Sequence, residues 1–342
     1  EEIAHQCRRI GVNVNFAPVV DVNNNANNPV INDRSFGENR HNVTAKSYMY
    51  MKGMQDGQLL ACAKHFPGHG DTDVDSHADL PIIYHNKERL DSVELFPFKV
   101  LAQHNVGSMM IAHLSIPALD NTPNLPSSLS RKIVTDLLKR QLGYQGLIFT
   151  DGLEMHGVRK YFKDGELEVK ALEAVNDILL LPSITPSALK AIKKAIKEGR
   201  LSQSEIDAKV KKVLASKFRL GLNAKPKVNR SNLSSELNSS NARQLKTELY
   251  ENALTAVRNN VNVLPLSRRD NQNIATISIG RGSRTTFQRT MDTYSKGIKH
   301  YYTGRNVSSS RSRSLIRSLK KKKFKVLAKK CLSIFQKEQQ VL

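Results

Sequence analysis

Short apolar segments alternate along this chain with longer segments in which apolar residues recur every three to four positions. The short segments predict strands at 12–20, 60–65, 108–113, 146–151 and 177–181. The longer segments predict helices at 42–56, 88–104, 130–142, 165–175, 185–199 and 203–218. Strands and helices that alternate in this way predict an α/β fold with a parallel sheet covered by helices.

Polar residues stand at the ends of the first four predicted strands, at Asp21, His65, His113 and Asp151. This placement is typical of a (β/α)8 TIM-type barrel, whose reactive groups gather at the carboxyl ends of the strands. A barrel has eight strands and the pattern shows five. We therefore expect a barrel that lacks its first strands, with the strands before Glu1 missing from this chain.

The strand and helix alternation stops after Gly221. We expect residues 1–221 to form the barrel domain, incomplete at its N-terminus, and the Asn-, Ser- and Lys-rich residues 222–242 to be a linker. Residues 243–342 then form a partial second α/β domain, with a helix at about 241–258 and a strand at 274–279. Its basic end has too little apolar content to close a domain.

The chain carries 53 Lys and Arg against 31 Asp and Glu, a formal net charge of +22. Residues 281–342 hold 17 of the basic residues and 2 of the acidic ones, so most of the excess belongs to this tail. Such a tail attracts polyanions non-specifically, and no motif indicates a specific nucleic acid partner. No apolar run approaches the roughly 20 residues that a membrane span needs, and three scattered cysteines indicate neither a disulfide framework nor a metal site.

The densest polar cluster is residues 64–77, KHFPGHGDTDVDSH, directly after a predicted strand. A zinc site could use the three histidines His65, His69 and His77, but no HExxH spacing is present. A calcium loop that starts at Asp71 would need Gly at position 76 and Glu at position 82, where Ser and Ile stand. We therefore expect no metal.

Acid–base chemistry is the alternative for this segment. Asp75 and His77 lie two positions apart, so in extended backbone they point to the same side, and the carboxylate can orient the imidazole. This pair would shuttle protons near neutral pH. The competing interpretation is a loop held together by local hydrogen bonds of its Asp and His side chains.

Three further residues have two interpretations each. Asp151, followed by Gly152, is either a nucleophile at a strand end or a helix cap. Arg34 either clamps a polar ligand or lies free on the surface, and His113 is either a ligand contact or a buried core histidine.

Residues 64–72, continuing to Asp75 and His77, resemble the signature of the β-N-acetylglucosaminidase branch of glycoside hydrolase family 3. The flanking segments NFAPVVD (15–21), RSFG (34–37), MIAH (110–113) and TDGLEM (150–155) resemble the family in order and approximate spacing. The resemblance covers about residues 1–221, and residues 249–266 resemble the entry to the family's second, α/β-sandwich domain.

The resemblance implies a retaining exo-glycosidase that removes terminal β-linked N-acetylglucosamine, with peptidoglycan fragments as a natural source. Asp151 matches the nucleophile, and His77, oriented by Asp75, matches the general acid/base. Lys64, His65 and Arg34 match residues that bind the sugar. We also expect His113 to contact the substrate.

No cofactor is expected, and the partner is a carbohydrate. A bacterial origin, in the cytoplasm or the periplasm, is implied by the resemblance alone, and the oligomeric state is left open. A phosphorylase is a close variant, because a histidine acid/base carries no negative charge to repel phosphate. Two further hypotheses are an inactive carbohydrate-binding remnant and a polyanion binder that acts through the basic tail.

Overall fold

The structure is a computed structural model that describes residues 1–73, 79–163, 165–182, 184–224, 227–255, 274–280, 283–295, 297–304, 308–321 and 325–329. The chain divides into two compact units, Glu1–Thr247 and Glu248–Leu342. Each unit is described by itself.

The first unit is built on a parallel sheet whose described strands follow one another in chain order. They are β1 (Val14–Asn15), β2 (Leu60–Phe66), β3 (Ser108–Ile111) and β4 (Leu147–Thr150). The fifth predicted strand is present as a single parallel bridge between Ile178 and Phe149. The α/β class with a parallel sheet is confirmed, whereas closure of a full barrel stays a prediction.

Helices alternate with these strands. The α-helices are α1 (Glu2–Arg9), α2 (Arg40–Asp56), α3 (Lys87–Ser92), α4 (Phe96–Gln103), α5 (His156–Arg159), α6 (Glu166–Glu173), α7 (Thr185–Lys197) and α8 (Gln203–Arg219). A π-helix spans Lys132–Gln141, and short 3-10 helices span Asn32–Arg34, Ser127–Leu129 and Leu222–Ala224. The single helix predicted at 88–104 is two helices, because Pro97 has no N–H for the carbonyl of Val93 and is accommodated only in the first turn of a new helix.

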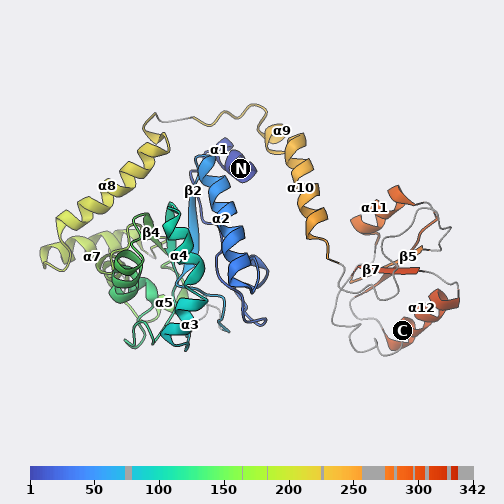
Figure 1. Cartoon of the computed structure of the whole chain (residues 1–342), viewed down its shortest axis with the longest axis horizontal. Helices are drawn as coiled ribbons and strands as arrows, with labels where there is room; N and C mark the ends of the chain where they lie inside the picture. Colours follow the sequence, from blue (N-terminus) through green and yellow to red (C-terminus); the bar gives the residue numbers. More distant parts are fainter. Residues whose placement is uncertain are drawn as a thin grey trace. The chain divides into compact units, whose positions relative to one another are not determined.

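The main core lies between the sheet and the helices α2 and α4. Helix α2 packs against both β2 and α4 (Figure 1). Phe66 at the end of β2 meets Phe98 of α4 edge to face, with ring centroids 5.3 Å apart, and both side chains are fully buried. This packing fixes the end of β2, from which the candidate site begins.

The segment predicted as a linker, 222–242, contains the short helix α9 (Leu233–Leu237), and α10 (Ser240–Ala253) begins within it. Arg9 of α1 pairs with Glu236 and donates to the backbone carbonyls of Asn229 and Ser231. One guanidinium thus ties this segment to the start of the first unit. The domain boundaries proposed from the sequence stay a prediction.

The second unit contains a parallel sheet in which β5 (Ile274–Ile279) lies between β6 (Lys299–Thr303) and β7 (Lys325–Lys329). Helices α11 (Thr286–Tyr294) and α12 (Ser309–Lys321) belong to it. Within the basic end, residues 309–321 form a helix and residues 325–329 a strand, and the expectation that this end has too little apolar content to close a domain stays a prediction. Leu315 and Leu319 lie one turn apart on α12 and pack in one cluster with Ala275 and Ile277 of β5.

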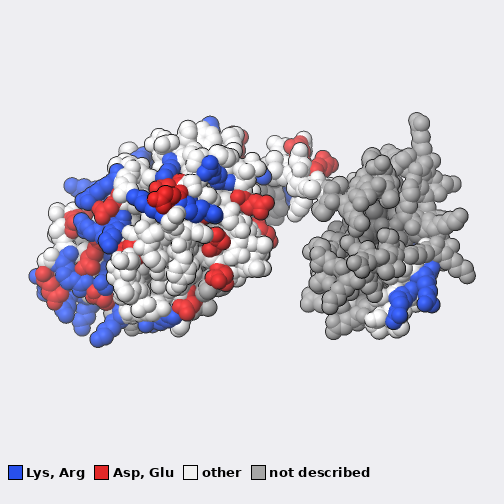
Figure 2. All heavy atoms as spheres, turned by 60° about the horizontal axis from the view of Figure 1, so that its bottom comes forward, with Lys and Arg blue, Asp and Glu red and all other residues white. Residues whose placement is uncertain are grey.

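Charges of both signs share the surface of the first unit. Basic side chains gather over α7 and α8, and acidic side chains lie between them (Figure 2). Arg200, for example, pairs with both Glu166 and Glu173. Among the described residues, no helix has the length and apolar character to cross a membrane.

Candidate active site

Polar side chains meet where the four strands of the first unit end. Asp21 follows β1, Lys64 and His65 are among the last three residues of β2, His113 follows β3 and Asp151 follows β4. Because the strands are parallel, these positions share one edge of the sheet. The sequence predicted polar residues at these strand ends, and the structure gives the contacts that each of them makes.

Asp21 holds the segment that follows β2. Its fully buried carboxylate accepts the backbone N–H of His65 at 3.2 Å, the backbone N–H of His69 at 2.7 Å, and Nδ1–H of His65 at 2.7 Å. Burial raises the pKa of Asp21, but the imidazole of His65 and then His69 lower it, and the net pKa lies below the usual value. Asp21 is therefore an ionised acceptor that orients His65.

Two glycines let the loop after β2 pack tightly on its surroundings. A Cβ at Gly70 would lie 2.0 Å from the carbonyl oxygen of Val22, in the segment after β1. A Cβ at Gly68 would lie 2.8 Å from Cβ of Glu94, and Gly68 has a φ of +132°. The loop is thus wedged between two neighbouring segments of the chain, which requires glycine at both positions.

Asn28 and Thr72 complete the support of this loop. The buried Asn28 amide donates to the carbonyl of His69 at 2.9 Å, and Nδ1 of His69 lies 2.8 Å from Oγ1 of Thr72. Burial, reinforced by the neighbouring His65, lowers the pKa of His69 to about 4. His69 is therefore neutral at physiological pH.

Asp151 lies half-buried at the centre of the group. The backbone N–H of Gly152 donates to its Oδ1 at 2.9 Å. Burial raises the pKa of Asp151, but the imidazoles of His65 and His113, the Gly152 N–H and the ammonium of Lys64 lower it, so that the net pKa lies below the usual value. Asp151 is thus an ionised carboxylate at neutral pH, the form that a nucleophile requires.

Three of the residues predicted to bind the sugar lie together. Arg34 Nη2 lies 3.5 Å from Nε2 of His65, and its Nη1 donates to the carbonyl of Val30 at 2.9 Å. Burial and the positive charge of Arg34 lower the pKa of Lys64. Lys64, His65 and Arg34 thus lie together, and Lys64 and His65 are near enough to Asp151 to act on its charge.

His113 is buried and uses both ring nitrogens. Nε2 donates to the carbonyl of Gly152 at 3.0 Å, and Nδ1 accepts from the hydroxyl of Ser128 at 2.7 Å. Burial lowers the pKa of His113, so the ring is neutral. In this arrangement His113 supports the backbone beside Asp151, and its expected contact with substrate stays a prediction.

The expected acid/base pair, Asp75 and His77, lies outside the described residues. Asp79 is the next described residue, and its carboxylate pairs with Lys160 and accepts the backbone N–H of Leu80. The roles assigned to Asp75 and His77 therefore rest on the sequence.

One group among the described residues has the donor set for a metal ion: Asp71, His85 and Glu94. Its charges are already compensated within the protein. His85 Nε2 lies 2.7 Å from Asp71 Oδ2, and Arg89 Nη2 lies 3.1 Å from Glu94 Oε1 and 3.9 Å from Asp71 Oδ2. The guanidinium lies between the two carboxylates, where a cation would bind, so the residues fit an ion-pair network better than a metal site.

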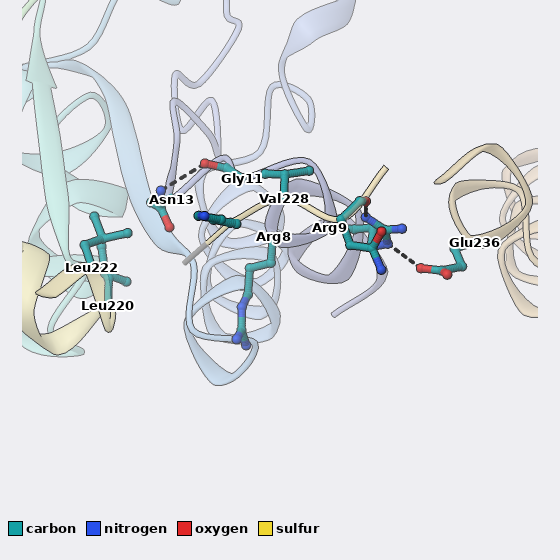
Figure 3. A pocket seen from close by; sticks show the side chains of 10 residues that line it. Arg8, Arg9, Gly11, Asn13, Leu220, Leu222, Val228 and Glu236 are labelled. Atoms are coloured by element: carbon teal, nitrogen blue, oxygen red, sulfur yellow. Dashed lines mark hydrogen bonds and ion pairs between the residues drawn. The ribbon is translucent and has the colours of Figure 1, made fainter. Parts of the chain in front are cut away.

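A pocket of about 590 Å³ lies elsewhere in the unit, beside the residues that precede β1 (Figure 3). Gly11, Asn13, Leu220 and Val228 line it, together with Arg9, which reaches toward Glu236 (Figure 3). Since Gly11 and Asn13 come before β1, the pocket belongs to the amino ends of the strands, opposite to the end that carries the candidate site. It contains none of the predicted site residues.

The sequence assigned no role in the site to Asp21, Asn28 or the Asp71–His85 pair. Asp21 carried the same signal as Asp151, a carboxylate at the end of an apolar strand. No comparable signal marked Asn28 or His85, because their partners lie 14 to 44 positions away.

Residues 1–216 match the family model described as the glycosyl hydrolase family 3 N terminal domain. The chain is 35% identical over 314 residues to beta-hexosaminidase A of Pseudoalteromonas piscicida, covering 86% of this chain and 52% of that protein. It is 34% identical over 220 residues to beta-hexosaminidase LpqI of Mycobacterium tuberculosis, covering 62% and 56%. The chain thus spans about half the length of the curated relatives that it matches.

Solved structures agree with these matches. A glycoside hydrolase family 3 beta-N-acetylglucosaminidase from Paenibacillus sp. str. FPU-7 aligns with a TM-score of 0.79 at 30% identity, covering 96% of this chain and 64% of that one. M. tuberculosis LpqI aligns with a TM-score of 0.59 at 33% identity, covering 63% and 64%. The family resemblance inferred from the sequence is confirmed.

Proposed function

The chain belongs to glycosyl hydrolase family 3, and on this basis we propose that it is a retaining exo-glycosidase that hydrolyses terminal β-linked N-acetylglucosamine. The sugar is supported by the relatives, which are named beta-hexosaminidase and beta-N-acetylglucosaminidase. Peptidoglycan fragments are the natural source of substrate in this proposal.

The observation that carries the proposal is the state of Asp151. It stands at the end of β4 with a lowered pKa, next to the ammonium of Lys64 and the N–H of Gly152. In the first step a carboxylate oxygen of Asp151 attacks the anomeric carbon as the bond to the leaving oxygen breaks. This inversion produces an α-linked glycosyl-enzyme.

His77, oriented by Asp75, supplies the proton in this proposal. Its imidazolium protonates the departing oxygen in the first step and is left neutral. In the second step the neutral ring takes a proton from water as the water oxygen attacks the anomeric carbon and the bond to Asp151 breaks. Two inversions give a β-configured product and return both residues to their starting states.

The remaining residues bind and orient. Lys64 and Arg34 present donors to the sugar hydroxyls, His65 binds the sugar beside them, and Asp21 fixes the ring of His65. His113 holds the carbonyl of Gly152 and thereby the backbone beside the nucleophile.

Hydrolysis of 4-nitrophenyl β-N-acetylglucosaminide by the 342-residue chain tests the proposal, with proton NMR of the first-formed anomer. We expect turnover with release of the β-anomer, and losses on the order of 10⁴-fold in Asp151→Ala and His77→Ala. The matched control is Asp136→Ala, which removes an exposed carboxylate paired with Arg140, and it should match wild type. Unchanged activity in Asp151→Ala, or an α-anomer as first product, contradicts the mechanism.

The acceptor is tested in the same assay. Hydrolysis predicts equal rates in phosphate and in a non-phosphate buffer, with free N-acetylglucosamine as product. A sugar 1-phosphate formed only in phosphate would identify a phosphorylase. Binding of N-acetylglucosamine without turnover would identify a carbohydrate-binding remnant instead.

A further inference from the structure

Asp71 stands at the start of the segment that leads to Asp75 and His77, and its side chain is held by residues near helix α3. We propose that His85, Arg89 and Glu94 are positioning residues that fix Asp71 and thereby set where the acid/base pair stands relative to Asp151. The inference rests on the proposed function, because it assigns the network a role in the same reaction.

The contacts define the network. His85 Nε2 lies 2.7 Å from Asp71 Oδ2, and Arg89 Nη2 lies 3.9 Å from the same oxygen. Arg89 Nη2 also lies 3.1 Å from Glu94 Oε1. Asp71 is therefore connected through Arg89 to a carboxylate that is only 1% exposed.

The burial of Glu94 is costly to the fold. Within the described residues, its Oε2 and the Nε of Arg89 are buried and have no hydrogen-bond partner. The side chain of its partner Arg89 is 37% exposed, so the pair is only partly buried and the guanidinium stays partly hydrated. The unsatisfied carboxylate oxygen of Glu94 costs desolvation free energy, and in this proposal a positioning role accounts for keeping the charge there.

Glu94 is also part of the wall on which the loop after β2 rests. A Cβ on Gly68 would lie 2.8 Å from Cβ of Glu94, so this loop packs directly against the residue. On the other side, the Asn25 amide donates to the carbonyl of Thr72 at 3.2 Å. Asp71 and Thr72 are thus held from two directions, which fixes the point from which the chain continues toward position 75.

Position matters because proton transfer requires the imidazole within hydrogen-bond distance of the leaving oxygen. A displacement of 1 Å costs about 10²-fold in rate. If the contacts that hold Asp71 are lost, we therefore expect Asp151 to remain in place as the nucleophile and His77 to be misplaced as the acid.

Leaving-group dependence distinguishes this defect from a general loss of structure. The value of kcat/KM reports the first step, in which a 2,4-dinitrophenolate leaves without protonation and an alkyl or sugar alcohol requires it. For His85→Leu we expect kcat/KM on chitobiose to fall about 10- to 100-fold, and kcat/KM on 2,4-dinitrophenyl β-N-acetylglucosaminide to stay within about 3-fold of wild type. His85→Gln places an amide N–H near the position of Nε2 and should recover most of the loss on chitobiose.

Asp71→Asn provides a second variant with the same expected pattern, and urea denaturation shows whether either variant is folded under assay conditions. Asp136→Ala is the control for loss of a single carboxylate. Equal losses on both substrates, or no loss on either, would overturn the inference. If His77→Ala itself shows no leaving-group dependence, the acid/base assignment in the proposed function fails, which is a separate result.

Discussion

Nδ1 of His65 lies 2.7 Å from Oδ2 of Asp21, and the two side chains are 6% and 0% exposed. The ionised carboxylate accepts the ring N–H and thereby turns Nε2 of the same ring toward Arg34. A residue that follows β1 thus determines the direction in which His65, the histidine at the end of β2 that we propose binds the sugar, points.

Asp21→Asn should destabilise the first unit by about 1–3 kcal/mol, because two buried N–H groups and one ring N–H lose a charged acceptor. The pKa of Asp21 is lowered in the folded state, so its contribution is present above the unfolded value of 3.8 and is lost as pH falls through the folded value. Urea denaturation at pH 7 and at pH 3 measures both effects. Equal stability of variant and wild type at pH 7 would contradict the assigned role.

Because of His69, we expect the stability of the first unit to depend on pH in a second range, above that of Asp21. Its pKa is about 4 in the folded state against 6.5 for the free side chain, so between these values the unfolded chain binds a proton that the folded chain does not. Stability should therefore fall as pH falls from about 6.5 to 4, by up to about 3 kcal/mol. His69→Asn should flatten this part of the stability curve, and identical slopes in variant and wild type would count against it.

His113→Phe tests whether this residue positions Asp151, the proposed nucleophile, or contacts the sugar. The variant leaves the Gly152 carbonyl and the Ser128 hydroxyl without their partner, so the backbone beside Asp151 loses its support. We expect kcat to fall about 10-fold, equivalent to about 1.4 kcal/mol, with KM nearly unchanged. A raised KM at unchanged kcat would instead support the substrate contact expected from the sequence.

Gly70→Ala should displace the loop after β2. The added methyl group would lie 2.0 Å from the carbonyl oxygen of Val22, a backbone atom that cannot rotate away. We expect a loss of stability of about 1–3 kcal/mol and a larger fall in activity than in stability. Gly304→Ala is the matched control, because a Cβ there meets nothing within 4 Å.

The sequence identified the parts of the fold that depend on local patterns. The predicted strands at 60–65, 108–113 and 146–151 match β2, β3 and β4 to within two residues at each end, because continuous apolar runs mark buried parallel strands. The strand predicted at 12–20 is shorter in the structure, where β1 spans Val14–Asn15. The helix predicted at 88–104 is divided before Pro97, because a residue without an N–H is accommodated in the first turn of a helix and not in its interior.

Local sequence patterns could not predict hydrogen bonds and ion pairs between residues that are distant in sequence. Asp151 and His65 could be identified because a strand end and a dense motif marked them, whereas the pairing of Asp71 with His85 depends on how a loop packs beside α3. The double hydrogen bonding of His113 likewise follows from the placement of the Ser128 hydroxyl and the Gly152 carbonyl, which sequence spacing does not determine. In the second unit, the packing of α12 onto β5 depends on two leucines that the surrounding basic residues obscured.

The three hydrogen bonds to Asp21 also bear on the order in which the protein folds. They join residues 44 and 48 positions apart, across the parallel pair of β1 and β2. Because closing such loops costs entropy before the contact contributes any stability, we expect the edge that carries the site to form after the local helices. The backbone N–H of His69 should therefore gain protection from hydrogen exchange later than the amides of α2, and the recovery of activity during refolding should follow it.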